Sequence, residues 1–182
     1  MVLAPHPDEV AVFEKRREIS CPIVIERDYI MRLISILTQV LSRTLLHRKV
    51  YEYPKAHREL EGAYTSLFGM TGELLYQFSN EQLIEMFGND DESVATKCYV
   101  LGSLMEEEGE VCQQEGEEVK GTNLSIRALG LLIESFLLAK HEIEEGHRGR
   151  IEGLLSRLVS SEIPLSVQER IRLYNDLKQE NG

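Results

Sequence analysis

The sequence predicts an all-α protein, either an antiparallel helical bundle or a solenoid, and three observations support this. No proline occurs from residue 55 to residue 163, between Pro54 and Pro164, which favours helix throughout. Apolar residues recur at helical spacing in several segments of the chain. No convincing run alternates apolar and polar residues as a strand would, and the only β-like fragment, Cys21 to Ile25, is short.

Composition places the chain among folded globular proteins. Its 182 residues are 42% hydrophobic, which is enough for one domain with an extension. Residues 1–26 carry three of the five prolines and a short charged piece, so we expect an N-terminal extension there and an all-helical domain over 27–182. The net charge of −11 excludes a general nucleic-acid binder, because neutralising phosphates requires clustered lysine and arginine.

Cysteine usage and the absence of targeting signals indicate a cytoplasmic protein. The three cysteines have no metal-like spacing and are expected to be reduced thiols. The first residues lack the basic start and apolar core of a signal peptide. The most apolar stretch, Ala128 to Ala139, is interrupted by Gly130 and Glu134, which argues against a membrane span.

The first strong helix is expected from Asp28, a plausible N-cap, to Arg48. Its apolar residues fall within one arc of about 180° on a helical wheel. An apolar face this wide is more than one neighbouring helix covers, so we expect it to contact two elements, one of which is a candidate second subunit. The residues that form this candidate dimer or partner face are Ile30, Leu33, Ile34, Leu37 and Leu41.

Capping signals divide the rest of the chain into further helices. A proline suited to the first turn and a glycine suited to the end predict a helix from Pro54 to Gly69. A short helical piece at 73–78 follows, and Ser79 with Gln82 has the spacing of a capping box that opens a helix ending near Gly88. The remaining helices are expected at 92–114, with an N-cap among Asn89, Asp90 and Asp91, at 123–145, at 147–160, and after a second capping box at Ser166 and Glu169.

Small residues recur over residues 102–135, where two antiparallel helices are expected to cross closely. Gly102 and Gly109 are one heptad apart, and glycine inside a helix costs about 1 kcal/mol relative to alanine, so both are expected at close-approach positions. The 34-residue pattern resembles one tetratricopeptide (TPR) unit, although no good second copy follows. That resemblance implies a groove that accepts a partner, lined by Ser103, Glu106, Glu110, Gln113 and Gln114.

The segment Glu26-Arg27-Asp28-Tyr29-Ile30-Met31-Arg32-Leu33-Ile34 precedes this pattern. Together they resemble a group of small helical proteins of Gram-positive bacteria that is described as a domain of unknown function. Its members open with a similar segment and continue with a TPR-like pair of helices. The resemblance covers residues 26–175 and implies a fold, but it brings no activity with it.

The acidic run at Glu106, Glu107, Glu108 and Glu110 is the most unusual local feature. We interpret it first as a solvated helix face; a surface for a basic partner segment and a cation site are the alternatives. His141 and His147 are six residues apart, about 240° around a helix, so they are not expected to share a metal and are interpreted as hydrated helix-end residues.

No nucleophile elbow, phosphate-binding loop or dinucleotide fingerprint occurs, so we predict no catalytic, cofactor-binding or metal-binding residues. The sequence therefore favours a non-enzymatic protein-interaction or scaffold module whose partner is a protein, with a basic segment as one candidate. Two alternatives remain: a small-ligand binder or enzyme that uses an inter-helical cleft, and a structural homodimer. Neither nucleic acid nor membrane is expected as a partner.

Overall fold

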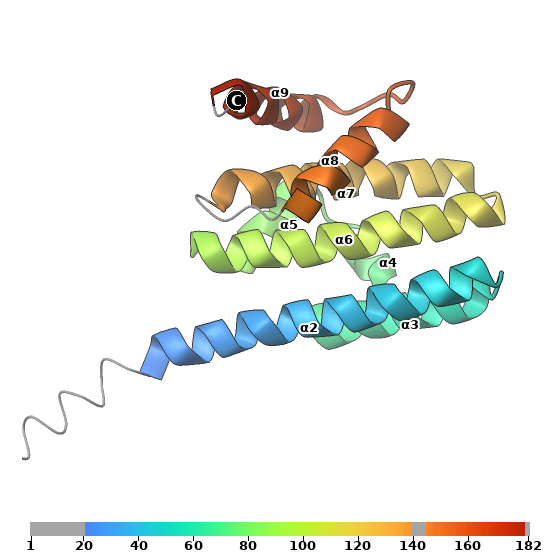
Figure 1. The fold of residues 1–182 in the computed structure, drawn as a ribbon, viewed down its shortest axis with the longest axis horizontal. Coiled ribbons are helices and arrows are strands. Elements are labelled where there is room, and N and C mark those ends of the chain that lie inside the picture. The colour runs from blue at the N-terminus through green and yellow to red at the C-terminus, as the bar shows by residue number, and fades with distance from the viewer. Residues whose placement is uncertain (1–20, 140–144, 181–182) are drawn as a thin grey trace, which may run out of the picture.

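The computed structural model describes residues 21–139 and 145–180, and within these ranges the chain is helical and contains no strand (Figure 1). The prediction of an all-α protein is confirmed. The β-like reading of Cys21 to Ile25 is wrong, because these residues form the beginning of the first described helix. The described helices are α2 (Cys21–Lys49), α3 (Tyr53–Phe68), α4 (Gly72–Leu75), α5 (Asn80–Phe87), α6 (Asp91–Glu115), α7 (Glu118–Leu138), α8 (Glu145–Arg157) and α9 (Leu165–Glu180).

Local signals correctly located several helix ends. α3 has its proline in the first turn and ends at Gly69, whose φ of 69° is left-handed and whose N–H donates to the Thr65 carbonyl. The capping box of α5 is complete, with both Ser79–Gln82 hydrogen bonds formed. The Asp90 carboxylate accepts a 2.8 Å hydrogen bond from the Ser93 N–H at the start of α6.

The N-terminal boundary differs from the prediction. Asp28 lies inside α2 and is not its N-cap, because the helix begins at Cys21. The expected division between residues 26 and 27 therefore falls within a continuous helix. Residues 1–20 of the predicted extension lie outside the described residues.

Three later boundaries were also wrong. α7 begins at Glu118, five residues before the expected start, and ends at Leu138 instead of 145. α9 begins at Leu165, so Ser166 lies in its first turn and the second capping box does not define its start. The Pro164 carbonyl instead accepts the N–H groups of Val167 and Gln168.

The antiparallel pair α6 and α7 forms the centre of the molecule (Figure 1). α2 and α3 form a second pair on one side of it, while α8 and α9 pack against α7 from the other. Large apolar side chains fill much of the space between these layers, and the middle of α6 is buried. Representative core residues are Leu101, Leu104, Met105, Leu129, Leu132 and Ile133.

Glycines let α6 and α7 approach closely. A Cβ placed at Gly109 would lie 2.9 Å from the Gly121 carbonyl oxygen, and one at Gly121 would lie 2.7 Å from the Gly109 oxygen. A Cβ at Gly102 would lie 3.0 Å from Leu132 Cγ. The expected close-approach roles of Gly102 and Gly109 are confirmed.

Two helices are long and apolar enough, by length and composition alone, to cross a membrane: residues 28–49 of α2 and all of α7. In α7, 67% of the apolar window is buried inside the protein, as expected for a core helix, whereas in α2 only 22% is buried. Most residues of the α2 window are therefore not fully buried, unlike those of the α7 window.

Candidate functional site

The glutamates of the acidic run lie in the enclosed middle of α6. Glu106, Glu107 and Glu108 are 7%, 8% and 7% exposed, and Glu110 is half-buried. The interpretation of this run as a solvated helix face is therefore wrong. A buried carboxylate is costly unless counter-charges and hydrogen bonds accompany it, so the surroundings of this acidic cluster (Glu106, Glu107, Glu108 and Glu110) decide what it does.

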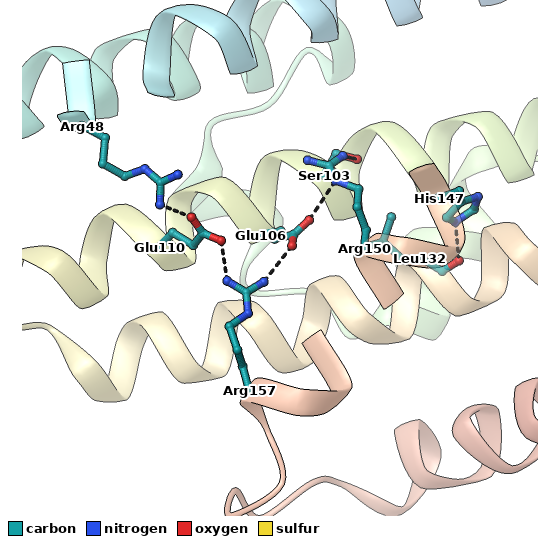
Figure 2. Close-up of polar contacts among 8 residues, drawn as sticks. All are labelled: Arg48, Ser103, Glu106, Glu110, Leu132, His147, Arg150 and Arg157. Carbon is teal, nitrogen blue, oxygen red and sulfur yellow. Dashed lines mark hydrogen bonds and ion pairs between the residues drawn. The ribbon is translucent and has the colours of Figure 1, made fainter. Parts of the chain in front are cut away.

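Two arginines of α8 pair with the cluster (Figure 2). Arg157 Nη2 lies 2.8 Å from Glu106 Oε1, and its Nη1 pairs with Glu110. Arg150 Nε lies 3.1 Å from Glu106 Oε2, and its Nη1 donates to the buried Ser103 hydroxyl. A basic partner segment was one alternative for this run, and the structure shows positive charge supplied by a helix of the same chain.

A third arginine comes from the C-terminal end of α2. Arg48 Nε lies 3.2 Å from Glu107 Oε1, and its Nη1 pairs with Glu110. Burial raises the pKa of the Glu107 carboxyl, and the positive charges of Arg48 and Arg150 oppose that rise. The Arg48–Glu107 contact does not reach hydrogen-bond alignment, so it is an ion pair without a full hydrogen bond.

The partners of Glu108 are two tyrosines and a lysine, not the arginines of α8. The Tyr64 hydroxyl donates to Glu108 Oε2 at 2.8 Å, and the Tyr76 hydroxyl donates to the same oxygen. Burial, together with the negative charge of Glu108, raises the pKa of both tyrosines well above its ordinary value. Lys120 Nζ lies 4.0 Å from Glu108 Oε1. Both tyrosines therefore remain neutral donors to a buried carboxylate.

The acidic cluster holds the layers together. Its four carboxylates face Arg48 of α2, Lys120 of α7, and Arg150 and Arg157 of α8, so charges of both signs are present in equal number. Removing one member of a buried pair typically costs about 3–5 kcal/mol, because the other charge is left uncompensated. This network positions α2 and α8 on α6.

Two cysteines and one histidine, Cys98, Cys112 and His147, lie in the interior. The half-buried His47 and His57 instead lie against the carboxylates of Glu52 and Glu115. Cys98 and Cys112 are fully buried, and burial raises the pKa of these thiols to about 12 and about 11. Neither has the lowered pKa of an activated nucleophile. His147 is buried and donates from Nε2 to the Leu132 carbonyl at 2.9 Å, so its interpretation as a hydrated helix-end residue is wrong. His141 lies outside the described residues.

The groove implied by the TPR resemblance is largely covered. Ser103 and Glu106 lie beneath the α8 arginines, Glu110 is half-buried between Arg48 and Arg157, and only Gln113 and Gln114 are exposed. The structure thus brings three of the five residues together around arginines of the same chain. The described residues contain no group of three or more metal-ligating side chains arranged around a common point.

The candidate partner face of α2 is mostly used inside the molecule. Leu33 and Leu37 are buried, and Ile30, Ile34 and Leu41 are half-buried. This face packs against α3 and α6, as its width suggested, and both neighbours belong to the same chain. Within residues 28–49 of α2, the large apolar residues that remain exposed lie outside the predicted set: Tyr29, Met31, Leu45 and Leu46.

Two hollows are features that sequence reasoning missed. The first, which we call the α2–α5 hollow, has a volume of about 280 Å³ and is lined by Tyr29, Leu67, Phe68, Met70, Met86, Phe87 and Lys97. The second, the α7 hollow, measures about 710 Å³ and lies beside the turn between α6 and α7. The walls of the α2–α5 hollow come from segments distant in sequence, whereas the α7 hollow is lined by residues between 116 and 127 together with Tyr76.

Comparisons with family models, with curated proteins and with solved structures find no match to this chain.

Proposed function

We propose that this protein is a non-catalytic protein-interaction or scaffold module, and that its partner binds at the α2–α5 hollow. The observation that carries the proposal is an apolar hollow with exposed apolar residues beside it. Tyr29 of α2 and Met86 of α5, which both line the hollow, are 43% and 51% exposed. Exposed apolar residues that gather around a concave site are typical of protein-binding surfaces.

The lining defines the chemistry of the partner. Aromatic and methionine side chains adapt to a bulky apolar side chain of a partner segment. Lys97 supplies one positive charge; its Nζ donates to the Phe87 carbonyl at 2.8 Å, and the described residues give it no carboxylate partner. The favoured partner is therefore a protein segment with a large apolar anchor and a nearby carboxylate.

The proposed partner site at the α2–α5 hollow is separate from the acidic cluster. Glu106 and Glu110 already pair with Arg150 and Arg157, so a basic partner segment would have to displace α8. The α2–α5 hollow needs no such displacement. We place the module in the cytoplasm, where reduced cysteines are expected.

A TPR-like arrangement of α6 and α7 is the architectural part of the proposal. It is supported by the antiparallel packing of the two helices and by the close approach at Gly109 and Gly121. The hairpin from Asp91 to Leu138 spans 48 residues, so the 34-residue pattern occupies only its middle. The resemblance to the Gram-positive helical family remains a prediction beside it.

The test compares two matched substitutions on exposed apolar residues. Met86→Glu adds a carboxylate at the hollow, whereas Val159→Glu adds one at an 81% exposed valine outside it. Proteins that bind the immobilised wild-type chain and the Val159→Glu variant, but not the Met86→Glu variant, would support the proposal. Equal binding to all three chains, or no binding to any, would overturn it.

Light scattering of the same three chains identifies whether the partner is a second copy. A wild-type dimer that Met86→Glu dissociates and Val159→Glu leaves intact would make the partner this chain itself, which is the homodimer alternative. Circular dichroism at 222 nm serves as the folding control for each variant, because the protein is almost entirely helical.

A further inference from the structure

The α7 hollow is independent of the proposed interaction surface and has its own chemistry. It is lined by Tyr76, at the end of α4, and by one face of the first turns of α7, with Lys120, Asn123, Leu124 and Arg127 at helical spacing. A tyrosine ring and a leucine therefore face the same space as two cationic side chains. At about 710 Å³, the hollow is large enough for a small organic molecule.

Arg127 is held rigidly at this hollow. Its Nη1 donates to the Tyr76 carbonyl at 2.9 Å, and its Nη2 donates to the carbonyls of Phe78 and Leu75 at 2.6 and 3.3 Å. Its guanidinium carbon lies 5.8 Å from the centre of the Tyr76 ring. These contacts already hold the Arg127 guanidinium in place. It need not rearrange when a ligand binds, which lowers the entropic cost of recognition.

The contacts of Arg127 with the described residues include no ion pair. Carbonyl oxygens accept hydrogen bonds but carry no net negative charge, and the described residues place no carboxylate within ion-pair distance of this guanidinium. A guanidinium has five N–H donors, of which three are used here. A half-buried cation with donors to spare is suited to bind a carboxylate or a phosphate.

The acidic residues at the hollow lie toward its other end. Glu117 and Glu118 are nine or more residues from Arg127 along α7, about 13 Å at 1.5 Å per residue. Glu117 is moreover paired with Lys120, whose Nζ is 3.5 Å from its carboxylate. The Arg127 end is therefore electropositive, while Tyr76 and Leu124 supply an apolar wall beside it.

From this arrangement we infer that the α7 hollow binds an organic carboxylate with a flat or apolar body, its anionic group at Arg127 and its body against Tyr76 and Leu124. Such a carboxylate can belong to a free small molecule or to the C-terminus of a peptide that ends in an aromatic residue. The two sources share this chemistry, and separate probes distinguish them.

The experiment titrates the full chain with three small probes and one peptide, followed by calorimetry or by NMR shifts of the α7 amides. 2-Naphthoate supplies the charge and the flat body, 2-naphthylmethanol only the body, and inorganic phosphate only a charge. An acetylated tripeptide ending in phenylalanine represents the peptide source. We expect naphthoate to bind with a Kd on the order of 1 mM, and the alcohol and phosphate to bind at least tenfold more weakly.

Variants locate the site. Asn123→Asp and Asn123→Glu each place a carboxylate in the hollow, at an exposed position one helical turn from Arg127. Both are expected to weaken naphthoate binding severalfold, whereas Lys178→Gln, on exposed α9, is expected to leave it unchanged. Because Asn123 is exposed, both variants are expected to fold.

The relative affinities of the probes identify the source of the carboxylate and test the inference. Tighter binding of the peptide than of naphthoate would assign the site to a protein C-terminus, and the reverse would assign it to a free metabolite-sized acid. Equal affinity for naphthoate and its alcohol would overturn the inference, as would binding that all three variants leave unchanged or no binding of either acid at 10 mM probe.

Discussion

Arg157 of α8 lies against Glu106 of α6, with 2.8 Å between Nη2 and Oε1, although the two residues are 51 positions apart in the chain. Glu106 is nearly enclosed, and Arg150 approaches its second oxygen. A carboxylate in this position is paired on both oxygens, so the helix that carries the two arginines depends on it for its placement.

Glu106→Gln is expected to destabilise the fold strongly, because it removes the charge that compensates two arginines while preserving the shape of the side chain. The expected loss is about 3 kcal/mol in the free energy of unfolding, measured by urea denaturation. Glu85→Gln changes an exposed glutamate of α5 and should alter stability by less than about 0.5 kcal/mol. Equal effects of the two substitutions would contradict a structural role for the cluster.

Gly109→Ala tests the close approach of α6 and α7. The added methyl group would meet the Gly121 carbonyl at 2.9 Å, and backbone atoms cannot move aside easily, so we expect a loss of about 1–3 kcal/mol in thermal or urea unfolding. Gly62→Ala, in exposed α3 with open space around the new methyl group, should instead stabilise the protein by about 1 kcal/mol. A stabilising effect at both positions would refute the tight crossing.

Stability is expected to fall above pH 10. The raised pKa values of Tyr64 and Tyr76 mean that the unfolded chain loses these protons first, so the unfolding free energy is retained below about pH 10 and decreases as the pH rises further. The expected slope is about 1.4 kcal/mol per pH unit for each tyrosine. Tyr64→Phe should reduce the slope measured from urea midpoints, whereas Tyr51→Phe, at a 78% exposed residue, should leave it unchanged.

Cys98 and Cys112 are expected to resist thiol reagents in the folded protein. Both are fully buried and keep their protons, with pKa values of about 12 and about 11. In a Cys21→Ser background, the absorbance of an aromatic disulfide reagent should show negligible release at pH 8 until urea is added. Rapid reaction of one equivalent before unfolding would show that one thiol is accessible.

The features that could be predicted from the sequence are those decided within a few residues. The Ser79–Gln82 box spans three positions, and Gly69 ends α3 through a bond to Thr65 four positions earlier. The apolar periodicity of α2 likewise identified Leu33 and Leu37 as interface residues, although it did not reveal that the partner helices belong to the same chain.

The counter-charges of Glu106 could not be predicted from its neighbours in the sequence. Its counter-charges lie at positions 150 and 157, and those of Glu110 include position 48, so no local window contains both members of a pair. A run of glutamates taken alone has the appearance of a solvated face. Arg127 could not be identified from the sequence either, because the carbonyls that hold it lie at the end of α4, some fifty residues earlier.

The positions of these arginines along the chain impose an order on assembly during synthesis. When α6 leaves the ribosome, Arg48 has already been made, but Arg150 and Arg157 have not. Until α8 emerges, the Glu106 carboxylate must therefore stay hydrated, and the middle of α6 cannot be fully buried. Completion of the fold is thus coupled to translation of the last quarter of the chain.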